Sequence, residues 1–382
     1  MSYGNATLAE LERVSLSASA LKSAGELVLQ IANATQLCEN LWLSSLAAND
    51  LFGTERQDGK SMQERRPMKS PTILWATWSD GLFAFGGDGH SHEIPNVSVR
   101  GLAPDGNGGA LAIVGSHSLS RYTSDGKLTA LAMSEFELSC CVAAGDVVYV
   151  GTDDARMLRL SDGSDFLEPI DAFNHVPGRD AWFAGSAIVD GQRVGPPLGV
   201  RSLAANSTGS ILFANVHVGG IARSTDGGRS WHPTIDINSD IHEVCAADAN
   251  PEIVVAAAAI GLCISRDSGK TWTIETNGLH DAHCYAVAIS RDDVLISAAK
   301  DPFAAPGRIY RKTLEPDGSL KAVEGGLPTW TAGMVDTACI ATRGSYVAVA
   351  DKGGNLYGSD DFGRTWSCRG TGLPTPSSIL FC

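Results

Sequence analysis

Five of the nine histidines lie close to the start or the end of apolar segments that resemble buried strands. They are His117, His217, His242, His280 and His283. Imidazole titrates near neutral pH and binds Zn, Fe, Cu or Mn, so the group predicts an acid/base site or a divalent metal site with His217, His242 and His283 as candidate ligands. No HExxH or comparable local motif accompanies them, and polar residues also line any hydrated cavity, so a purely structural role stays open.

A second set of residues combines two arginines with a carboxyl group and a phenol. Arg100, Arg201, Glu243 and Tyr285 take equivalent places when the strand-like segments are aligned. Arginines bind a sugar carboxylate bidentately, and a tyrosine polarised by a glutamate acts as a nucleophile in some glycoside hydrolases. The set therefore predicts Glu243 and Tyr285 as catalytic residues and the arginines as ligand-binding residues. A structural or simple binding role for all four is the alternative.

Composition excludes several classes of protein. Glycine accounts for 42 of 382 residues and charged residues for 19%, which favours short strands and turns over a helical bundle. The net charge of −14 disfavours nucleic acid and anionic membranes as partners. No apolar run is long enough to span a bilayer, and the amino terminus carries Glu10 and Glu12 where a secretory signal has basic residues. We therefore expect a cytoplasmic protein.

The nine cysteines do not form a recognisable metal or redox motif. Their number is odd, Cys140 and Cys141 are adjacent, and no CxxC spacing occurs. Most lie in apolar strand-like segments, where a thiol usually acts as a small buried hydrophobe. The sequence predicts reduced core cysteines, with a redox or catalytic thiol as the alternative.

One turn sequence recurs with the pattern S-x-D-x-G-x-[S/T]-W. These repeat turns span residues 224–231, 265–272 and 359–366, and their fixed positions are Asp226 and Trp231, Asp267 and Trp272, and Asp361 and Trp366. The first two tryptophans are 41 residues apart and the last two 94, which is two periods of 47. The spacing predicts a degenerate copy at residues 315–319, and 122–126 and 161–163 look like earlier ones. A period of about 40–50 residues with four short strands is typical of propeller blades.

The residue types of this turn suit a hairpin between the two outer strands of a blade. Aspartate accepts backbone N–H bonds, glycine supplies a positive φ, Ser or Thr satisfies further backbone groups, and tryptophan packs between sheets. The pattern resembles the Asp-box of BNR-repeat proteins, a group that includes sialidases, sortilin-type receptors and photosystem II assembly factors. The resemblance covers residues 72–382 and implies that the Asp-box residues lie on the periphery and are structural. The chain departs from the sialidases because it lacks their Arg-Ile-Pro motif, a third arginine and their order of site residues.

The apolar segments predict an all-β, seven-bladed β-propeller. Six innermost strands are expected at residues 99–103, 138–143, 200–204, 242–246, 284–288 and 337–341. Residues 72–96 have room for three strands, and residues 378–382 form a lone strand. Pairing these two ends completes a seventh blade without leaving a free sheet edge.

The amino-terminal part differs in pattern from the rest of the chain. Apolar residues recur there at roughly helical spacing and are followed by a polar stretch that ends near Pro67. We expect residues 1–67 to form a helical or disordered extension with a linker, and residues 68–382 to form the propeller. Because Met68 directly precedes the first strand-like segment, natural translation starting there is a further hypothesis.

The loops that enter the innermost strands or leave the second strands meet at the central funnel of a propeller. Asp301 and Asp351 leave second strands, and Trp182 lies in the long segment 172–199, which could cover the funnel as a lid. Other polar residues at such positions are Asp80, Asp153, Asp240, Asp336 and Lys352. The leading hypothesis is an Asp-box propeller that binds a small-molecule, glycan or protein ligand in this funnel. The alternative is a hydrolase, either sialidase-like or a metal-assisted hydrolase or lyase.

Overall fold

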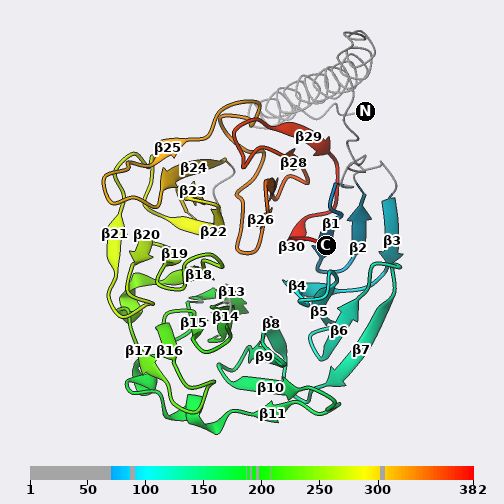
Figure 1. Ribbon diagram of the computed structural model, residues 1–382, viewed down its shortest axis with the longest axis vertical. Coiled ribbons are helices and arrows are strands. Elements are labelled where there is room, and N and C mark those ends of the chain that lie inside the picture. The colour runs from blue at the N-terminus through cyan, green and yellow to red at the C-terminus, as the bar shows by residue number, and fades with distance from the viewer. Residues whose placement is uncertain are drawn as a thin grey trace, which may run out of the picture. The chain divides into compact units, whose positions relative to one another are not determined.

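The computed structural model describes residues 70–86, 91–185, 187–189, 192–194, 198–206, 208–301 and 306–382. Within these ranges, seven four-stranded antiparallel sheets follow one another around a closed ring (Figure 1). The predicted seven-bladed propeller is confirmed. The extension predicted over residues 1–67 lies outside the described residues.

Each blade takes four consecutive strands, except blade 1, which also uses the last strand of the chain. Blades 1 to 3 contain β1 (Ile73–Thr77), β2 (Gly81–Phe85), β3 (Ser91–Pro95), β4 (Val99–Pro104), β5 (Ala110–Val114), β6 (Ser118–Tyr122), β7 (Leu128–Met133), β8 (Leu138–Ala144), β9 (Val147–Thr152), β10 (Met157–Ser161) and β11 (Glu168–Pro169). Blades 4 and 5 contain β14 (Val200–Ala205), β15 (Leu212–Val216), β16 (Gly220–Ser224), β17 (His232–Pro233), β18 (Ile241–Ala246), β19 (Val254–Ala258), β20 (Gly261–Ser265) and β21 (Thr273–Glu275). Blades 6 and 7 and the closing strand are β22 (Cys284–Ser290), β23 (Asp293–Ala299), β24 (Gly307–Thr313), β25 (Lys321–Ala322), β26 (Ile340–Arg343), β27 (Tyr346–Ala350), β28 (Leu356–Ser359), β29 (Ser367–Gly370) and β30 (Pro376–Phe381).

The remaining elements are short and connect the blades. Between blades 3 and 4 lie η1 (Asp171–His175), η2 (Arg179–Ala181) and a hairpin of β12 (Ala187–Val189) and β13 (Gln192–Val194), and η3 (Ile237–Ser239) precedes blade 5. In the described part of the chain no helix is long and apolar enough to cross a membrane.

The second strands of the blades form the core, because each is covered on both faces by neighbouring sheets. Every residue of β15 and of β19 is buried, which explains why both are apolar, except for Asn215 in β15, and do not alternate. The apolar clusters accordingly join adjacent blades; one unites residues of blades 6, 7 and 1. This packing holds the innermost strands rigidly around the axis.

The ring closes by pairing the two ends of the propeller. In blade 1 the sheet order is β3-β2-β1-β30, so the carboxyl-terminal strand is innermost. Ile73 pairs with Phe381, and Trp75 pairs with Ile379. The predicted closure is confirmed, as are the six other predicted innermost strands, which correspond to β4, β8, β14, β18, β22 and β26.

The repeat turns join the third and outermost strands of blades 4, 5 and 7, away from the axis. In blade 4, Asp226 Oδ1 accepts hydrogen bonds from Ser224 Oγ at 2.8 Å and from Ser230 N at 2.9 Å. Gly228 has φ +83° and donates its N–H to Ser224 Oγ, and Trp231 Nε1 donates to the Gly228 carbonyl. The hydrogen bonds of the aspartate and the serine are therefore used within the turn.

The other two repeat turns repeat these bonds, with one difference. Asp267 and Asp361 each accept from the following threonine N–H and hydroxyl, as Asp226 does from Ser230. Trp366 Nε1 bonds within its own turn, whereas Trp272 Nε1 donates to Thr234 Oγ1 near the outer edge of blade 4. The degenerate copy predicted at residues 315–319 lies between β24 and β25, and those at 122–126 and 161–163 lie at the equivalent places in blades 2 and 3.

Candidate functional site

A pocket of about 710 Å³ lies at the centre of the ring. Every blade lines it with residues at or beside its innermost strand: Ser377, Arg100, Cys140, Arg201, His242, Tyr285 and Thr337. Its volume falls within the range of about 300–1,000 Å³ that is usual for small-molecule sites. A second cavity of about 490 Å³ lies on the outer rim beside β24 and β25, and none of the catalytic or ligand-binding residues predicted from the sequence lines it.

Most of the site residues predicted from the sequence line the central pocket. These are Arg100, Arg201, His217, His242, Glu243, His283 and Tyr285. They converge because the innermost strands enter the ring in the same direction, so residues near the start of each strand face one end of the axis.

Three predicted ligand-binding residues lie elsewhere in the described structure. Trp182 is only 8% exposed, with its ring 5.8 Å from that of Phe173 in the core between blades 3 and 4. Asp351 is fully buried and accepts N–H bonds from Ala332 and Asn355. Asp301 follows β23 but is not among the residues that line the pocket. Trp182 and Asp351 therefore stabilise the fold where they lie, and the segment 172–199 reaches the pocket through Gly185 and Gly199 instead.

Both arginines of the pocket already have carboxylate partners. The guanidinium of Arg100 forms a bidentate pair with the carboxylate of Asp153. Arg201 donates to Asp336 Oδ1 at 3.4 Å and to Thr337 Oγ1 at 3.3 Å, and Lys352 Nζ lies 3.0 Å from Asp336 Oδ2. Neither arginine is thus free to clamp a ligand carboxylate, as the sequence interpretation had required.

Two carboxyl groups of the pocket have pKa values shifted in opposite directions. Burial raises the pKa of Asp336, but Arg201 and Lys352 lower it by more, so this group stays ionised. Burial raises the pKa of Glu243 to about 8, although backbone N–H groups oppose the shift. Glu243 accepts from Val287 N at 2.8 Å and from Ala338 N at 3.1 Å. It therefore links the innermost strand of blade 5 to blades 6 and 7.

Tyr285 carries an unused hydroxyl group at the wall of the pocket. The residue is 2% exposed, and its hydroxyl has no hydrogen-bond partner among the described residues. Burial raises its pKa well above the usual value for a phenol. A tyrosine nucleophile requires a base at its hydroxyl, and the oxygens of Glu243 bind backbone instead. The predicted Glu243–Tyr285 relay is thus not formed in this structure.

Aromatic rings form one wall of the pocket. The rings of His242, His283 and Tyr285 are parallel to within 9°, with centroids 4.8, 4.8 and 5.1 Å apart. Trp78 is 53% exposed and lies with its ring 5.6 Å from the Arg100 guanidinium carbon. The sequence interpretation missed Trp78, although it leaves the second strand of blade 1 in the same loop as Asp80, and the rule applied to the other blades would have selected it.

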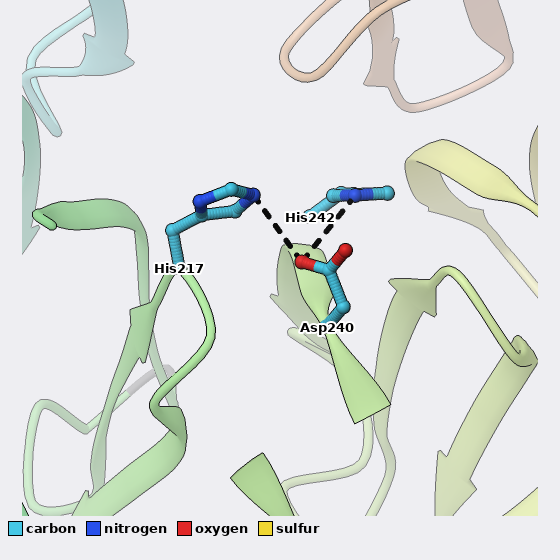
Figure 2. Close-up of side chains that lie close together, drawn as sticks. All are labelled: His217, Asp240 and His242. Atoms are coloured by element: carbon cyan, nitrogen blue, oxygen red, sulfur yellow. Dashed lines mark ion pairs between the residues drawn. The ribbon is translucent and has the colours of Figure 1, made fainter. Parts of the chain in front are cut away.

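His217 and His242 lie on two sides of the Asp240 carboxylate (Figure 2). His217 Nε2 is 3.2 Å from Asp240 Oδ1, and His242 Nε2 is 3.7 Å from the same oxygen. Burial lowers the pKa of His242, which favours its neutral form. Burial raises the pKa of Asp240, but His217 and His242 lower it by more, so Asp240 is ionised. The group of His217, Asp240 and His242 has metal-ligand spacing, whereas the predicted set had His283 in place of Asp240.

Two adjacent cysteines, Cys140 and Cys141, line the pocket and bear on the alternative of a reactive cysteine. Burial raises the pKa of Cys140 to about 12 and also raises that of Cys141, so both are thiols at neutral pH and poor nucleophiles. The eight cysteines in the described ranges are all free thiols. Four of these eight are buried, as expected for cysteines in core strands.

Comparisons with known proteins identify the fold. No protein-family model matches the sequence, and no curated protein does. Similar solved structures include an ancestral GH74 enzyme, with 13% identity over 82% of this chain and 40% of that one and a TM-score of 0.53. The computationally designed Ika8 protein (13% identity, 79% and 81% of the two chains, TM-score 0.49) and the GH74 xyloglucanase from Xanthomonas campestris (17%, 78% and 47%, TM-score 0.48) are also similar. The chain spans less than half the length of these two GH74 proteins, and the similarity shows the fold alone.

Proposed function

We propose that this chain is an Asp-box propeller that binds a neutral, hydroxyl-rich small molecule, such as an oligosaccharide, in its central pocket. The observation that carries the proposal is the buried Tyr285 hydroxyl, which has no partner among the described residues and belongs to a residue that lines a pocket of ligand size. A buried hydroxyl without a partner is unfavourable by about 1–3 kcal/mol, so such groups are usually satisfied by water or by a ligand.

The charges of the pocket support a neutral ligand. Its three cations are Arg100, Arg201 and Lys352, and its three carboxylates are Asp153, Asp240 and Asp336. These charges cancel when Glu243 and the imidazoles are neutral. Because the cations are already paired, an anionic ligand would have to break an ion pair, whereas sugar hydroxyls can donate to the carboxylates and accept from the guanidinium groups.

The aromatic residues support a ligand with flat apolar faces as well as hydroxyl groups. Trp78 exposes its ring at the pocket, and the parallel rings of His242, His283 and Tyr285 lie on another wall. An aromatic ring packs well against the C–H face of a pyranose while the hydroxyls at the ring edge reach polar partners.

Titration calorimetry with neutral oligosaccharides, with N-acetylneuraminic acid as the anionic comparison, tests this proposal. We expect a neutral sugar to bind, and we expect Trp78→Ala to weaken the binding by about 5-fold or more, since an aromatic contact contributes about 1 kcal/mol. Trp330→Ala is the matched control, because Trp330 is 45% exposed but does not line the pocket. Binding of only the anionic sugar, or equal losses in both variants, would contradict the proposal.

A glycoside hydrolase is the second candidate, and one observation favours it. The pKa of Glu243 is raised to about 8 and that of Asp336 is lowered, and such divergence is typical of an acid/base pair. Reducing-end release from the same oligosaccharides tests this function. Activity that is lost in Asp336→Asn while sugar binding persists would support catalysis, and an absence of turnover in the wild-type protein would leave binding alone.

A further inference from the structure

Three side chains of the pocket direct potential ligand atoms at one point (Figure 2). His217 follows β15 in blade 4, Asp240 directly precedes β18 in blade 5, and His242 lies within β18. Their ligand atoms all lie within 4.8 Å of one another. Since the three residues come from two rigid blades, their spacing is fixed by the fold and not by a flexible loop alone.

The spacing fits a small transition-metal ion. Zinc binds imidazole nitrogen and carboxylate oxygen at about 2.0–2.2 Å, which separates the ligands of a tetrahedral site by about 3.3 Å. The distances from Asp240 Oδ1 to the Nε2 atoms of His217 and His242 are 3.2 and 3.7 Å. A bound ion therefore requires shifts of a few tenths of an ångström in these two distances. The third distance, between the two imidazole nitrogens, is at most 4.8 Å and shortens by up to about 1.5 Å.

Asp240 Oδ1 has acceptor capacity that the described residues use only in part. This oxygen is buried and has no hydrogen bond of normal geometry among the described residues, even though His217 lies 3.2 Å away. Asp240 also adopts φ +46°, a left-handed conformation that non-glycine residues seldom take and that is more frequent at functional sites. Asp240 at the end of η3 thus holds a carboxylate oxygen close to two imidazoles.

The Nδ1 atom of His242, which faces away from Asp240, is held by a hydrogen bond of the kind that metal-binding histidines usually make. His242 Nδ1 lies 2.6 Å from the carbonyl oxygen of Cys284, so Nδ1 carries the proton. In the neutral ring, Nε2 then presents its lone pair toward Asp240. A backbone carbonyl in this position is a common outer partner of zinc-bound histidine.

The Nδ1 atom of His217 faces a hydrogen-bond donor, whereas Nδ1 of His242 faces an acceptor. Gly185 donates its N–H to His217 Nδ1 at 3.3 Å, so Nε2 carries the proton in the neutral ring. Metal binding at Nε2 moves this proton to Nδ1, where it faces the Gly185 N–H, so the bond is lost and the two donors must separate, at a cost of about 1–3 kcal/mol. Only glycine fits at position 185, because a Cβ atom there would lie 1.8 Å from His217 Cε1.

From this geometry we infer that His217, Asp240 and His242 bind one divalent transition-metal ion, of which Zn²⁺ is the probe. Two imidazoles and one carboxylate form a three-residue set that leaves at least one position open, and all three residues line the central pocket. His283 is not a ligand, although its ring lies 5.1 Å from that of His242. The site goes beyond the proposed sugar binding and does not depend on it.

Titration calorimetry of the chelator-treated full chain with ZnCl₂ tests the inference. We expect one zinc ion per chain and a rise in Tm with zinc, and with Co²⁺ we expect the visible absorption of a four-coordinate site. Asp240→Asn and His242→Gln should each weaken zinc binding by about 100-fold or more, since even outer-shell changes weaken metal binding by about 10–100-fold. Asparagine tolerates the left-handed conformation at position 240, and circular dichroism without metal checks that both variants fold.

His283→Gln is the matched control, because it changes a neighbouring imidazole of the same pocket outside the ligand set. We expect its zinc affinity to equal that of the wild-type chain. A wild-type chain that does not bind zinc, or zinc binding that survives Asp240→Asn, would overturn the inference. Because this titration contains no sugar and the sugar titration needs no metal, failure of either proposal is distinguishable from failure of the other.

Discussion

At the scale of single residues, two tyrosines show how the pocket differs from the core. The hydroxyl of Tyr285 has no partner within the described structure, whereas the hydroxyl of Tyr149 donates to the Gly227 carbonyl at 3.1 Å. Both side chains are buried. A polar group that lowers stability is retained in proteins mainly where a ligand uses it.

Substitution of each tyrosine by phenylalanine should have opposite effects on stability. Tyr285→Phe removes an unsatisfied hydroxyl, so we expect the free energy of unfolding to stay equal or to rise by up to about 1 kcal/mol. Tyr149→Phe loses a hydrogen bond and should lower it by about 1 kcal/mol. Chemical denaturation of both variants measures the difference. A clear loss of stability in Tyr285→Phe would mean that its hydroxyl already has a partner in the free protein.

Glu243 should make the stability of the propeller depend on pH. Its pKa is raised from 4.5 to about 8 by burial in the folded chain. A raised folded-state pKa contributes stability that is complete below about pH 4.5 and is lost as the pH rises through about 8. Over this range the free energy of unfolding should fall by an amount on the order of a few kcal/mol. Asp336 does not oppose this trend, since its lowered pKa keeps it ionised throughout.

Glu243→Gln isolates this effect. Glutamine does not ionise, so Tm should vary less between pH 5 and pH 8 in the variant than in the wild-type chain. Because its amide nitrogen cannot accept the bond that Val287 N or Ala338 N donates, the variant should be less stable at pH 5. The difference in stability between Glu243→Gln and the wild-type chain should then become smaller toward pH 8, because only the wild-type chain loses stability as Glu243 ionises. Parallel Tm curves for the two proteins would exclude Glu243 as the titrating group.

At the scale of elements, the sequence was informative about strands and turns but not about which side chains reach the pocket. The S-x-D-x-G-x-[S/T]-W pattern predicts the repeat turns because its bonds are local, as those of Asp226 show. The pairing of Arg100 with Asp153 joins residues 53 positions apart in different blades. Such pairs depend on how neighbouring blades are placed, and no local pattern encodes that placement.

The degenerate turn of blade 6 is another feature whose position was predicted but whose chemistry was not. Lys312 is fully buried in β24, and its Nζ donates to the carbonyls of Gly318 and Glu315 and lies 3.1 Å from Glu275 Oε2 in blade 5. An ammonium donor to carbonyls thus replaces the serine and aspartate of the intact repeat turns. A single lysine in an apolar strand gives no sign of this role, because strand lysines are usually exposed.

Lys312→Met should therefore destabilise blade 6. The substitution keeps most of the apolar volume but leaves the two carbonyls and Glu275 without the ammonium group, so we expect a loss of about 3 kcal/mol. Lys321→Met is the control, because Lys321 is exposed in the adjacent strand β25 and should change stability by less than about 0.5 kcal/mol. Equal stabilities of the two variants, measured by urea denaturation, would show that the turn does not need the buried lysine.

At the scale of the whole propeller, the number of blades and their closure were predictable because they depend on repeat length and on edge pairing. The pocket at the axis follows from the same closure, since six innermost strands and the segment that leads into β26 line it. The metal-ligand set was predicted only in part: His217 and His242 were chosen, but Asp240 was given no role. The role of Asp240 in this set depends on its left-handed backbone conformation, with φ +46°. Sequence patterns predict such a conformation well only at glycine.

The stability of the whole ring should depend on β30, the strand that pairs with β1 and closes it. Removal of residues 376–382 would expose the edge of β1 and uncover the apolar contacts of Ile379 and Phe381, which are 4% and 7% exposed. Burial of two such side chains contributes about 1.5–3 kcal/mol each, and the lost strand pairing adds to this. The total approaches the full stability of a typical domain, about 5–15 kcal/mol. We therefore expect the truncated chain to unfold at a much lower temperature and to self-associate through the free edge.

A peptide that spans residues 376–382 should reverse both changes when it is added to the truncated chain, because it can restore the missing strand beside β1. The control peptide carries Ile379→Asp and Phe381→Asp, which keep the backbone pairing groups but remove the buried apolar surface. Thermal unfolding and size-exclusion chromatography with each peptide measure the recovery. If the truncated chain alone kept the wild-type Tm and stayed monomeric, the ring would be held by packing between blades, and the pairing of its two ends would be dispensable.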